Sequence, residues 1–105
     1  MKTSFRDICL DWFKIHELDL SQCGFSVRVR RSPDNVDNPS ITAEIDTPYL
    51  TSQVTIWESG ECIKEAIELE TDAFLINEAL QLDRPTQASI VLAQFCTQLG
   101  CSIVE

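Results

Sequence analysis

The hydrophobic side chains of this 105-residue chain follow two different periods along the sequence. Near the N-terminus they recur every three or four residues, which predicts an amphipathic helix over about residues 4–17 with Thr3 or Ser4 as its N-cap. Between about residues 25 and 80 they alternate with polar side chains, as in half-buried strands. Beyond about residue 85 the helical period returns, and Gly100 stands where a C-terminal cap belongs.

Turn-forming residues divide the alternating region into short strands. The predicted strands cover about residues 25–30, 41–46, 49–58, 61–69 and 74–80. The end of the last strand, about 78–80, is equally compatible with a helix. Because no helical crossover separates the strands, we expect an antiparallel meander of four or five strands. The sequence therefore predicts an α+β fold in a single domain over 1–105, with both helices on one face of the sheet.

The clearest turn is formed by Ser59 and Gly60, because glycine accepts the positive φ that a tight hairpin requires. A two-residue loop would place these residues opposite each other: Glu58 and Glu61, Trp57 and Cys62, Ile56 and Ile63, Thr55 and Lys64. One face of the sheet would then be the core face, with Ile41, Ala43, Ile45, Val54, Ile56, Ile63, Ile67 and Leu69. The other, open face would carry Thr42, Glu44, Asp46, Tyr49, Thr51, Gln53, Thr55, Trp57, Cys62, Lys64, Ala66 and Glu68. Tyr49 and Trp57 stand there as aromatic anchors do in protein interfaces, although Trp57 also fits under a terminus or the 31–39 loop.

Charge limits the classes of partner. Eight basic and seventeen acidic residues give a net charge of −9, which opposes binding to nucleic acid and to anionic membranes. Seven carboxylates lie between residues 58 and 78, whereas Arg28, Arg30 and Arg31 cluster on the first predicted strand and its exit. A solvated charged face and a docking surface for a basic partner both fit this pattern.

The five cysteines are scattered along the chain, and no C-x-x-C pair is present. We expect free thiols that pack as small apolar residues, hold no metal and indicate a reducing cytoplasm. No apolar run reaches the length of a membrane span, and the first residues lack the apolar segment of a secretory signal. The expected location is therefore the cytoplasm.

Few residues of the sequence are arranged as a catalytic group requires. His16 is the only histidine and lies about two helical turns from Cys9, beyond direct contact. Three glycines are too few for a phosphate-binding loop. Glu58 and Glu61 flank a turn and are expected to be solvated rather than to form an acid–base pair. We therefore expect neither an enzyme nor a cofactor or metal site.

The predicted hairpin resembles a known family. Residues 54–62 read V-T-I-W-E-S-G-E-C, and this is similar to a hairpin of bacterial immunity proteins of the TriTu type, which an acidic strand and a C-terminal helix follow. The resemblance is good over 41–68 and weaker up to residue 99. Ile63 and Lys64 depart from the usual alternation of an acid with an apolar residue, and 101–105 extend past the expected end.

The resemblance implies an immunity protein that binds one cognate antibacterial toxin, one to one, and occludes its active site or its target surface. In this family the toxin is an ADP-ribosyltransferase that modifies elongation factor Tu, delivered by Rhs-type effectors of type VI secretion systems. The predicted toxin-binding residues are Glu44, Asp46, Tyr49, Trp57, Glu58, Glu61, Lys64 and Glu68. An acidic adaptor or chaperone-like module for a basic client protein is the alternative.

Overall fold

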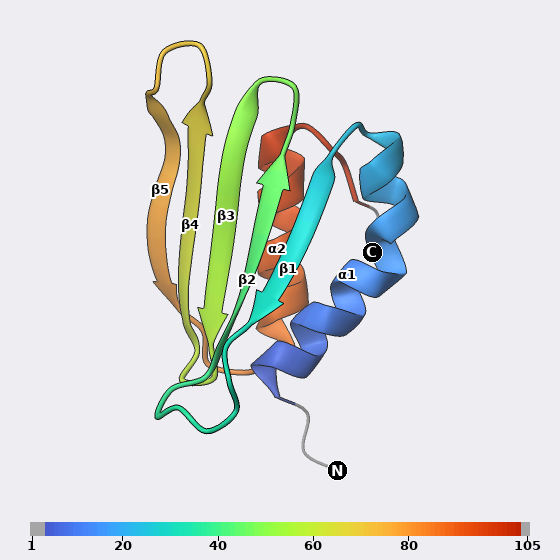
Figure 1. Cartoon of the computed structure of the whole chain (residues 1–105). Coiled ribbons are helices and arrows are strands. Elements are labelled where there is room, and N and C mark those ends of the chain that lie inside the picture. The colour runs from blue at the N-terminus through green and yellow to red at the C-terminus, as the bar shows by residue number, and fades with distance from the viewer. Residues whose placement is uncertain (1–3, 104–105) are drawn as a thin grey trace.

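The structure is a computed structural model, and it describes residues 4–103. Its elements in chain order are α1 (Phe5–Gln22), β1 (Ser26–Arg31), β2 (Ser40–Asp46), β3 (Leu50–Trp57), β4 (Glu61–Glu68), β5 (Phe74–Gln81) and α2 (Gln87–Leu99). The strands form one antiparallel sheet in the order β1-β2-β3-β4-β5 (Figure 1). The predicted α+β fold is confirmed, and the last predicted strand remains a strand to its end.

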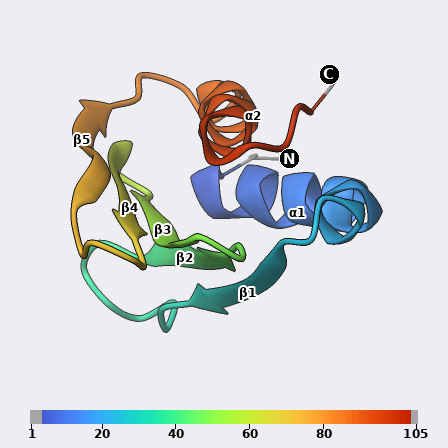
Figure 2. The ribbon, with the colours of Figure 1, turned by 90° about the horizontal axis from the view of Figure 1, so that it is seen from above.

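Both helices lie on the same face of the sheet, as Figure 2 shows. α1 begins after Ser4, whose hydroxyl accepts a hydrogen bond from the Asp7 N–H, as predicted for an N-cap. It runs past the predicted end at residue 17 because Leu20 extends its buried stripe. α2 ends at Gly100 in the left-handed conformation, which confirms the predicted cap.

The β3–β4 hairpin differs from the prediction by one residue. Its loop has three residues rather than two, and Gly60 within it takes a φ of +93° and donates its N–H to the Trp57 carbonyl. Ile56 consequently pairs with Cys62, not with Ile63. The predicted register of this hairpin is therefore wrong.

The shift reverses the two faces of β4, since a slip of one residue turns every side chain to the opposite side. Cys62, Lys64 and Ala66 were predicted on the open face, but they are buried on the side of the helices. Ile63 and Ile67 were predicted in the core, but they lie on the open face, and Ile63 is 37% exposed. The open face of β4 is thus more apolar than the sequence indicated.

The core lies between the sheet and the two helices. α2 contributes Leu92 and Phe95 to it, and α1 contributes Cys9, Trp12 and Leu20. The side chains of β2 and β3 that were predicted for the core face are confirmed there: Ile41, Ala43, Ile45, Val54 and Ile56.

Two of the five cysteines form a disulfide, so the prediction that all are free is wrong. Cys23 at the end of α1 is bonded to Cys101 just after α2, 78 positions further along the chain. The bond forms because α1 and α2 pack against each other and bring these two helix ends together. Cys9, Cys62 and Cys96 are free and buried, as predicted. In the described part of the chain, no helix is long and apolar enough to cross a membrane.

Candidate protein-binding site

Two turns meet at one end of the sheet, at the top of Figure 1. Tyr49 lies in the β2–β3 turn and Leu69 in the β4–β5 turn, and the Leu69 N–H donates to the Tyr49 carbonyl at 2.9 Å. The exposed fractions are 77% for Tyr49, 53% for Leu69, 54% for Phe74 and 55% for Leu75. Single exposed apolar residues are common, but a cluster of large ones indicates an interaction site. We call Tyr49, Leu69, Phe74 and Leu75 the apolar tip.

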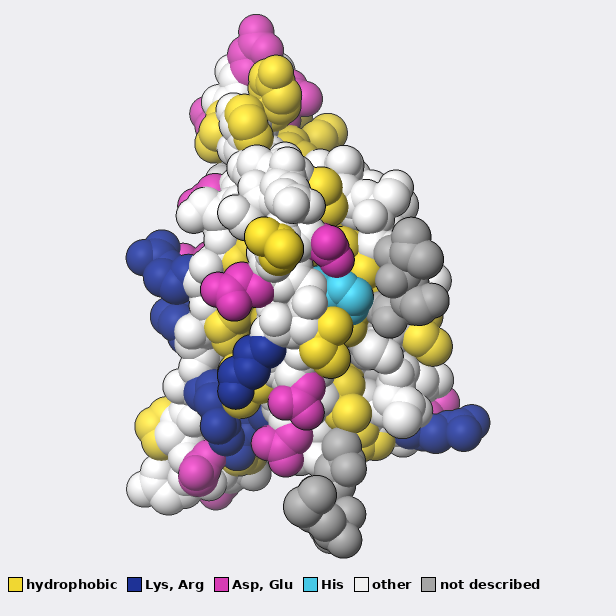
Figure 3. Space-filling view, turned by 90° about the vertical axis from the view of Figure 1, so that its right-hand side faces the viewer, with side chains coloured by type: hydrophobic (Ala, Val, Ile, Leu, Met, Phe, Trp, Pro, Cys, Tyr) yellow, Lys and Arg dark blue, Asp and Glu magenta, His cyan; other side chains and the backbone are white. Residues whose placement is uncertain are grey.

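Carboxylates surround the apolar tip. Glu68 ends β4, and Glu70 and Asp72 follow in the β4–β5 turn, where Asp72 takes a φ of 59°. The Thr71 hydroxyl donates to the Glu68 carboxylate at 2.9 Å and orients it. Apolar side chains and carboxylates gather together at the top of Figure 3. An apolar centre with a charged rim is typical of protein interfaces.

The corrected register extends this apolar surface along the open face of the sheet. Ile67 pairs with Phe74 of the tip, and Ile63 stands further along β4 on the same face. Trp57 is half-buried at the end of β3, and the exposed Glu61 begins β4 at the far end of this face. Apolar side chains therefore follow β4 away from the tip.

On the β1–β2 side of the open face, the Glu44 carboxylate is already paired with two arginines. The Glu44 carboxylate lies 2.6 Å from the Arg28 guanidinium and 2.7 Å from that of Arg30. The hydrogen bond from Arg28 and the charge of Arg30 hold the pKa of Glu44 below its usual range. The exposed Asp46 accepts a hydrogen bond from the Thr51 hydroxyl at 2.9 Å. Glu44 is thus already paired, whereas Asp46 still faces solvent.

Two more predicted contact residues are turned away from the open face. Lys64 is 4% exposed on the side of the helices, and its Nζ lies 3.5 Å from the Glu78 carboxylate. Glu58 reaches the first turn of α1, where it accepts hydrogen bonds from the N–H groups of Phe5 at 3.0 Å and Arg6 at 3.3 Å. The Arg6 guanidinium donates to the same carboxylate at 3.1 Å. Glu58, which was expected to be solvated, is therefore part of the packing of α1 on the hairpin.

Replacing Glu58 with alanine is expected to lower the free energy of unfolding by about 2 kcal/mol, because the start of α1 loses its carboxylate and buried Arg6 loses a partner. Chemical denaturation measures the effect. Glu61→Ala is the matched control, since Glu61 is an exposed glutamate of the same hairpin, and we expect it to change stability by less than about 0.5 kcal/mol. Equal effects of the two substitutions would contradict the assigned role of Glu58.

Burial sets the reactivity of the free thiols. It raises the pKa of Cys9 to about 12, that of Cys62 to about 11 and that of Cys96 to about 12. These thiols therefore stay protonated near neutral pH. His16 is buried against Trp12, with ring centroids 4.6 Å apart. Among the residues that the structure describes, no three His, Cys, Asp or Glu side chains form a metal-binding group.

The structure brings only part of the predicted site together. Tyr49 and Glu68 belong to the apolar tip and its rim. Leu69 was predicted on the core face, but it is 53% exposed in the β4–β5 turn, so that prediction is wrong. Phe74 and Leu75 were not predicted as contact residues. The sequence does contain a signal for Leu69, Phe74 and Leu75. These large apolar residues lie on either side of the turn at 70–73, where their exposed side chains have no core to pack against.

An exposed apolar tip with an acidic rim, on a small α+β scaffold, is typical of small protein-binding domains. The chain belongs to the TriTu immunity protein family, whose model matches residues 4–98. This match confirms the resemblance seen in the hairpin at 54–62. A comparison with curated proteins gave no match.

Proposed function

We propose that this protein binds one cognate antibacterial toxin and neutralises it by covering its active site or its target surface, without catalysis of its own. The observation that carries this function is the apolar tip with its acidic rim in a member of an immunity protein family. The toxin is an ADP-ribosyltransferase acting on elongation factor Tu, delivered by an Rhs-type effector of a type VI secretion system, and the hairpin at 54–62 supports this assignment. The immunity protein acts in the cytoplasm, where elongation factor Tu is found.

The apolar tip is the centre of the proposed one-to-one contact. Tyr49 and Phe74 are exposed in the free protein, and aromatic side chains that lose water on binding supply much of the affinity of an interface. Glu68, Glu70 and Asp72 attract basic residues of the toxin, which speeds the encounter and orients it. The net charge of −9 adds to this attraction at longer range.

The remaining predicted contacts divide between binding and folding. Asp46, Trp57 and Glu61 lie on the open face and extend the proposed contact from the tip. Three other residues stabilise the fold, because each has a hydrogen-bond or ion-pair partner within the chain: Glu44, Glu58 and Lys64. Substitutions of the second group change stability as well as binding and are poor tests of the interface.

The double substitution Tyr49→Ala and Phe74→Ala is expected to weaken toxin binding by roughly tenfold or more, because it removes both aromatic anchors of the tip. The ligand for calorimetry is an ADP-ribosyltransferase toxin domain that the wild-type protein neutralises on co-expression. Ile90→Ala is the matched control, since Ile90 is 56% exposed on α2 and is also a large apolar residue. We expect the control to bind like the wild type.

Growth on co-expression separates the possible functions. An immunity protein restores the growth of cells that produce its one cognate toxin, whereas an adaptor for basic clients restores none. Failure of the wild type to bind and to rescue would contradict the proposed function. Normal binding by the double variant would leave that function standing and place the contact elsewhere.

A further inference from the structure

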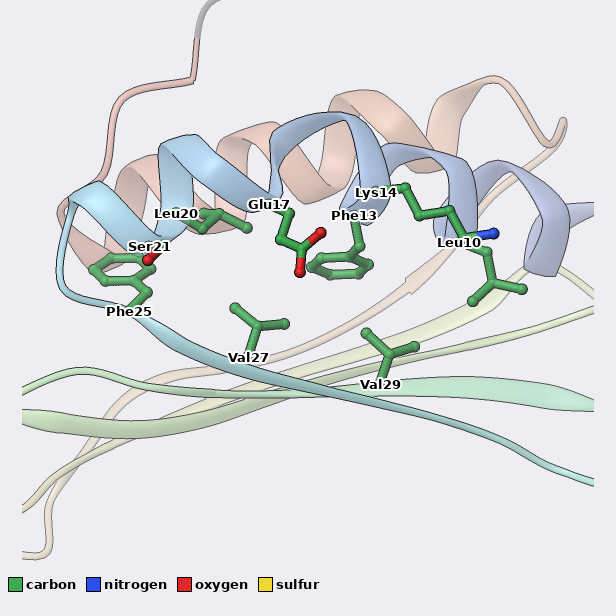
Figure 4. A pocket seen from close by; sticks show the side chains of 9 residues that line it. All are labelled: Leu10, Phe13, Lys14, Glu17, Leu20, Ser21, Phe25, Val27 and Val29. Atoms are coloured by element: carbon green, nitrogen blue, oxygen red, sulfur yellow. The ribbon is translucent and has the colours of Figure 1, made fainter.

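β1 forms an open edge of the sheet, and α1 runs beside it. Between them lies a groove of about 360 Å³ whose apolar lining is Leu10, Phe13, Leu20, Phe25, Val27 and Val29. Figure 4 shows these side chains converging from the helix and the strand, with Lys14 and Glu17 along the upper rim. Val27 and Val29 are only half-buried, so the core is not closed at this edge.

The hydrogen bonds at the ends of β1 show which backbone groups face outward. Ser32 donates its N–H to the Ser40 carbonyl, toward β2, whereas Phe25 donates its N–H to Leu20 of α1, away from β2. Backbone groups of an antiparallel strand alternate between its two sides. The even-numbered residues of β1 therefore bond to β2, and the N–H and C=O groups of Val27 and Val29 point along the free edge.

The hydrogen bonds of β2 agree with this alternation. Glu58 donates its N–H to the Pro39 carbonyl, so the odd-numbered residues of β2 face β3 and its even-numbered residues face β1. In the part of the chain that the structure describes, no strand lies beyond β1. The edge thus offers both backbone partners and side-chain space to one additional strand.

The charges at this edge determine what kind of strand fits. Arg28 and Arg30 are 74% and 59% exposed on the open face, and they share the single carboxylate of Glu44. Arg31 adds a third guanidinium on the same strand, and this one lies 3.6 Å from the Asp34 carboxylate. Two copies of this edge would bring like charges together, which opposes self-pairing. An acidic strand would instead complete the charge balance.

We propose that the β1 edge and the α1–β1 groove bind an extended segment of the toxin, which adds a sixth strand to the sheet. Its alternate side chains are apolar and acidic: the apolar ones enter the groove, and the acidic ones lie on the open face near Arg28 and Arg30. Main-chain hydrogen bonds hold the segment and alternate side chains select it, as in other cases of strand addition. This inference rests on the proposed function, since it takes the toxin as the partner.

The substitution Val29→Pro tests the edge directly, because it removes an N–H that faces outward and leaves the ladder to β2 intact. Val29→Ala is the matched control, since it shortens the same side chain and keeps the N–H. With the toxin domain that the wild type neutralises as ligand, we expect the proline variant to bind roughly tenfold or more weakly than the alanine variant. Circular dichroism checks that both variants are folded.

Hydrogen exchange on the unmodified protein supplies a second measurement that does not depend on the folding of a variant. We expect the amides of Val27 and Val29 to exchange more slowly in the toxin complex than in the free protein. Equal affinities of the two variants, or unchanged exchange of these amides in a complex that does form, would overturn the edge as a binding site. Absence of any complex with the wild type would overturn the proposed function instead.

Discussion

Replacing Cys23 with serine is expected to lower the free energy of unfolding by about 4 kcal/mol under oxidising conditions. The bond to Cys101 closes a loop with a sequence separation of 78 residues, and it restricts the unfolded chain more strongly than a short loop would. Cys23 is exposed, so serine at this position costs little beyond the loss of the bond.

A reducing agent supplies the control for this prediction. In chemical denaturation, the wild type with reductant should have the same free energy of unfolding as Cys23→Ser. The free energy of unfolding of the variant itself should not change when reductant is added. The free thiols of Cys9, Cys62 and Cys96 are the same in both proteins. A wild type whose stability is unchanged by reductant would show that the bond contributes nothing. In that case, reduction of the Cys23–Cys101 bond in the cytoplasm, which we propose as the location of the protein, would not lower its stability.

The order of the elements could be predicted from the sequence because it depends on local periodicity. The helical stripe of α1, the alternation in β2 and β3, and the cap at Gly100 each depend on a few neighbouring residues, and each is confirmed. Patterns of this kind reflect which side of an element is buried. They do not specify what that side packs against.

Register could not be predicted because it depends on the length of one loop. Ser59 and Gly60 indicate a turn, but the residues do not show whether Glu58 belongs to the strand or to the loop. The one-residue difference moved Ile63 to the open face and Lys64 to the buried face. The alternation in β4 fitted both registers, because apolar side chains stand at odd and even positions of this strand alike.

Long-range pairings are the second kind of feature that the sequence did not reveal. The Cys23–Cys101 bond and the contact of Glu58 with α1 join residues far apart in the chain. In contrast, the acidity of 58–78 was visible at once, and the structure shows that Glu68, Glu70 and Asp72 form a rim around apolar side chains. Composition thus indicated the charge of the surface, and the fold supplied its apolar centre.

The hairpin that carries the family resemblance is held against the loop before α2 through its glycine. Gly60 accepts a hydrogen bond from the Leu82 N–H at 2.8 Å, and a Cβ at Gly60 would overlap the Leu82 carbonyl. Gln81 extends the contact by donating its side-chain amide to the Ser59 carbonyl at 2.9 Å. Space and backbone conformation therefore both require glycine at this position.

Gly60→Ala is accordingly expected to lower the free energy of unfolding by about 3 kcal/mol, since the side chain meets backbone atoms and the φ of +93° is unfavourable for alanine. Gly24→Ala is the matched control, because Gly24 has a φ of +81° with open space around it. For the control we expect the free energy of unfolding to fall by about 1 kcal/mol, from backbone strain alone. Chemical denaturation of both variants separates the effect of steric overlap with Leu82 from that of backbone strain. Equal losses in the free energy of unfolding would show that the hairpin moves away from Leu82 without cost.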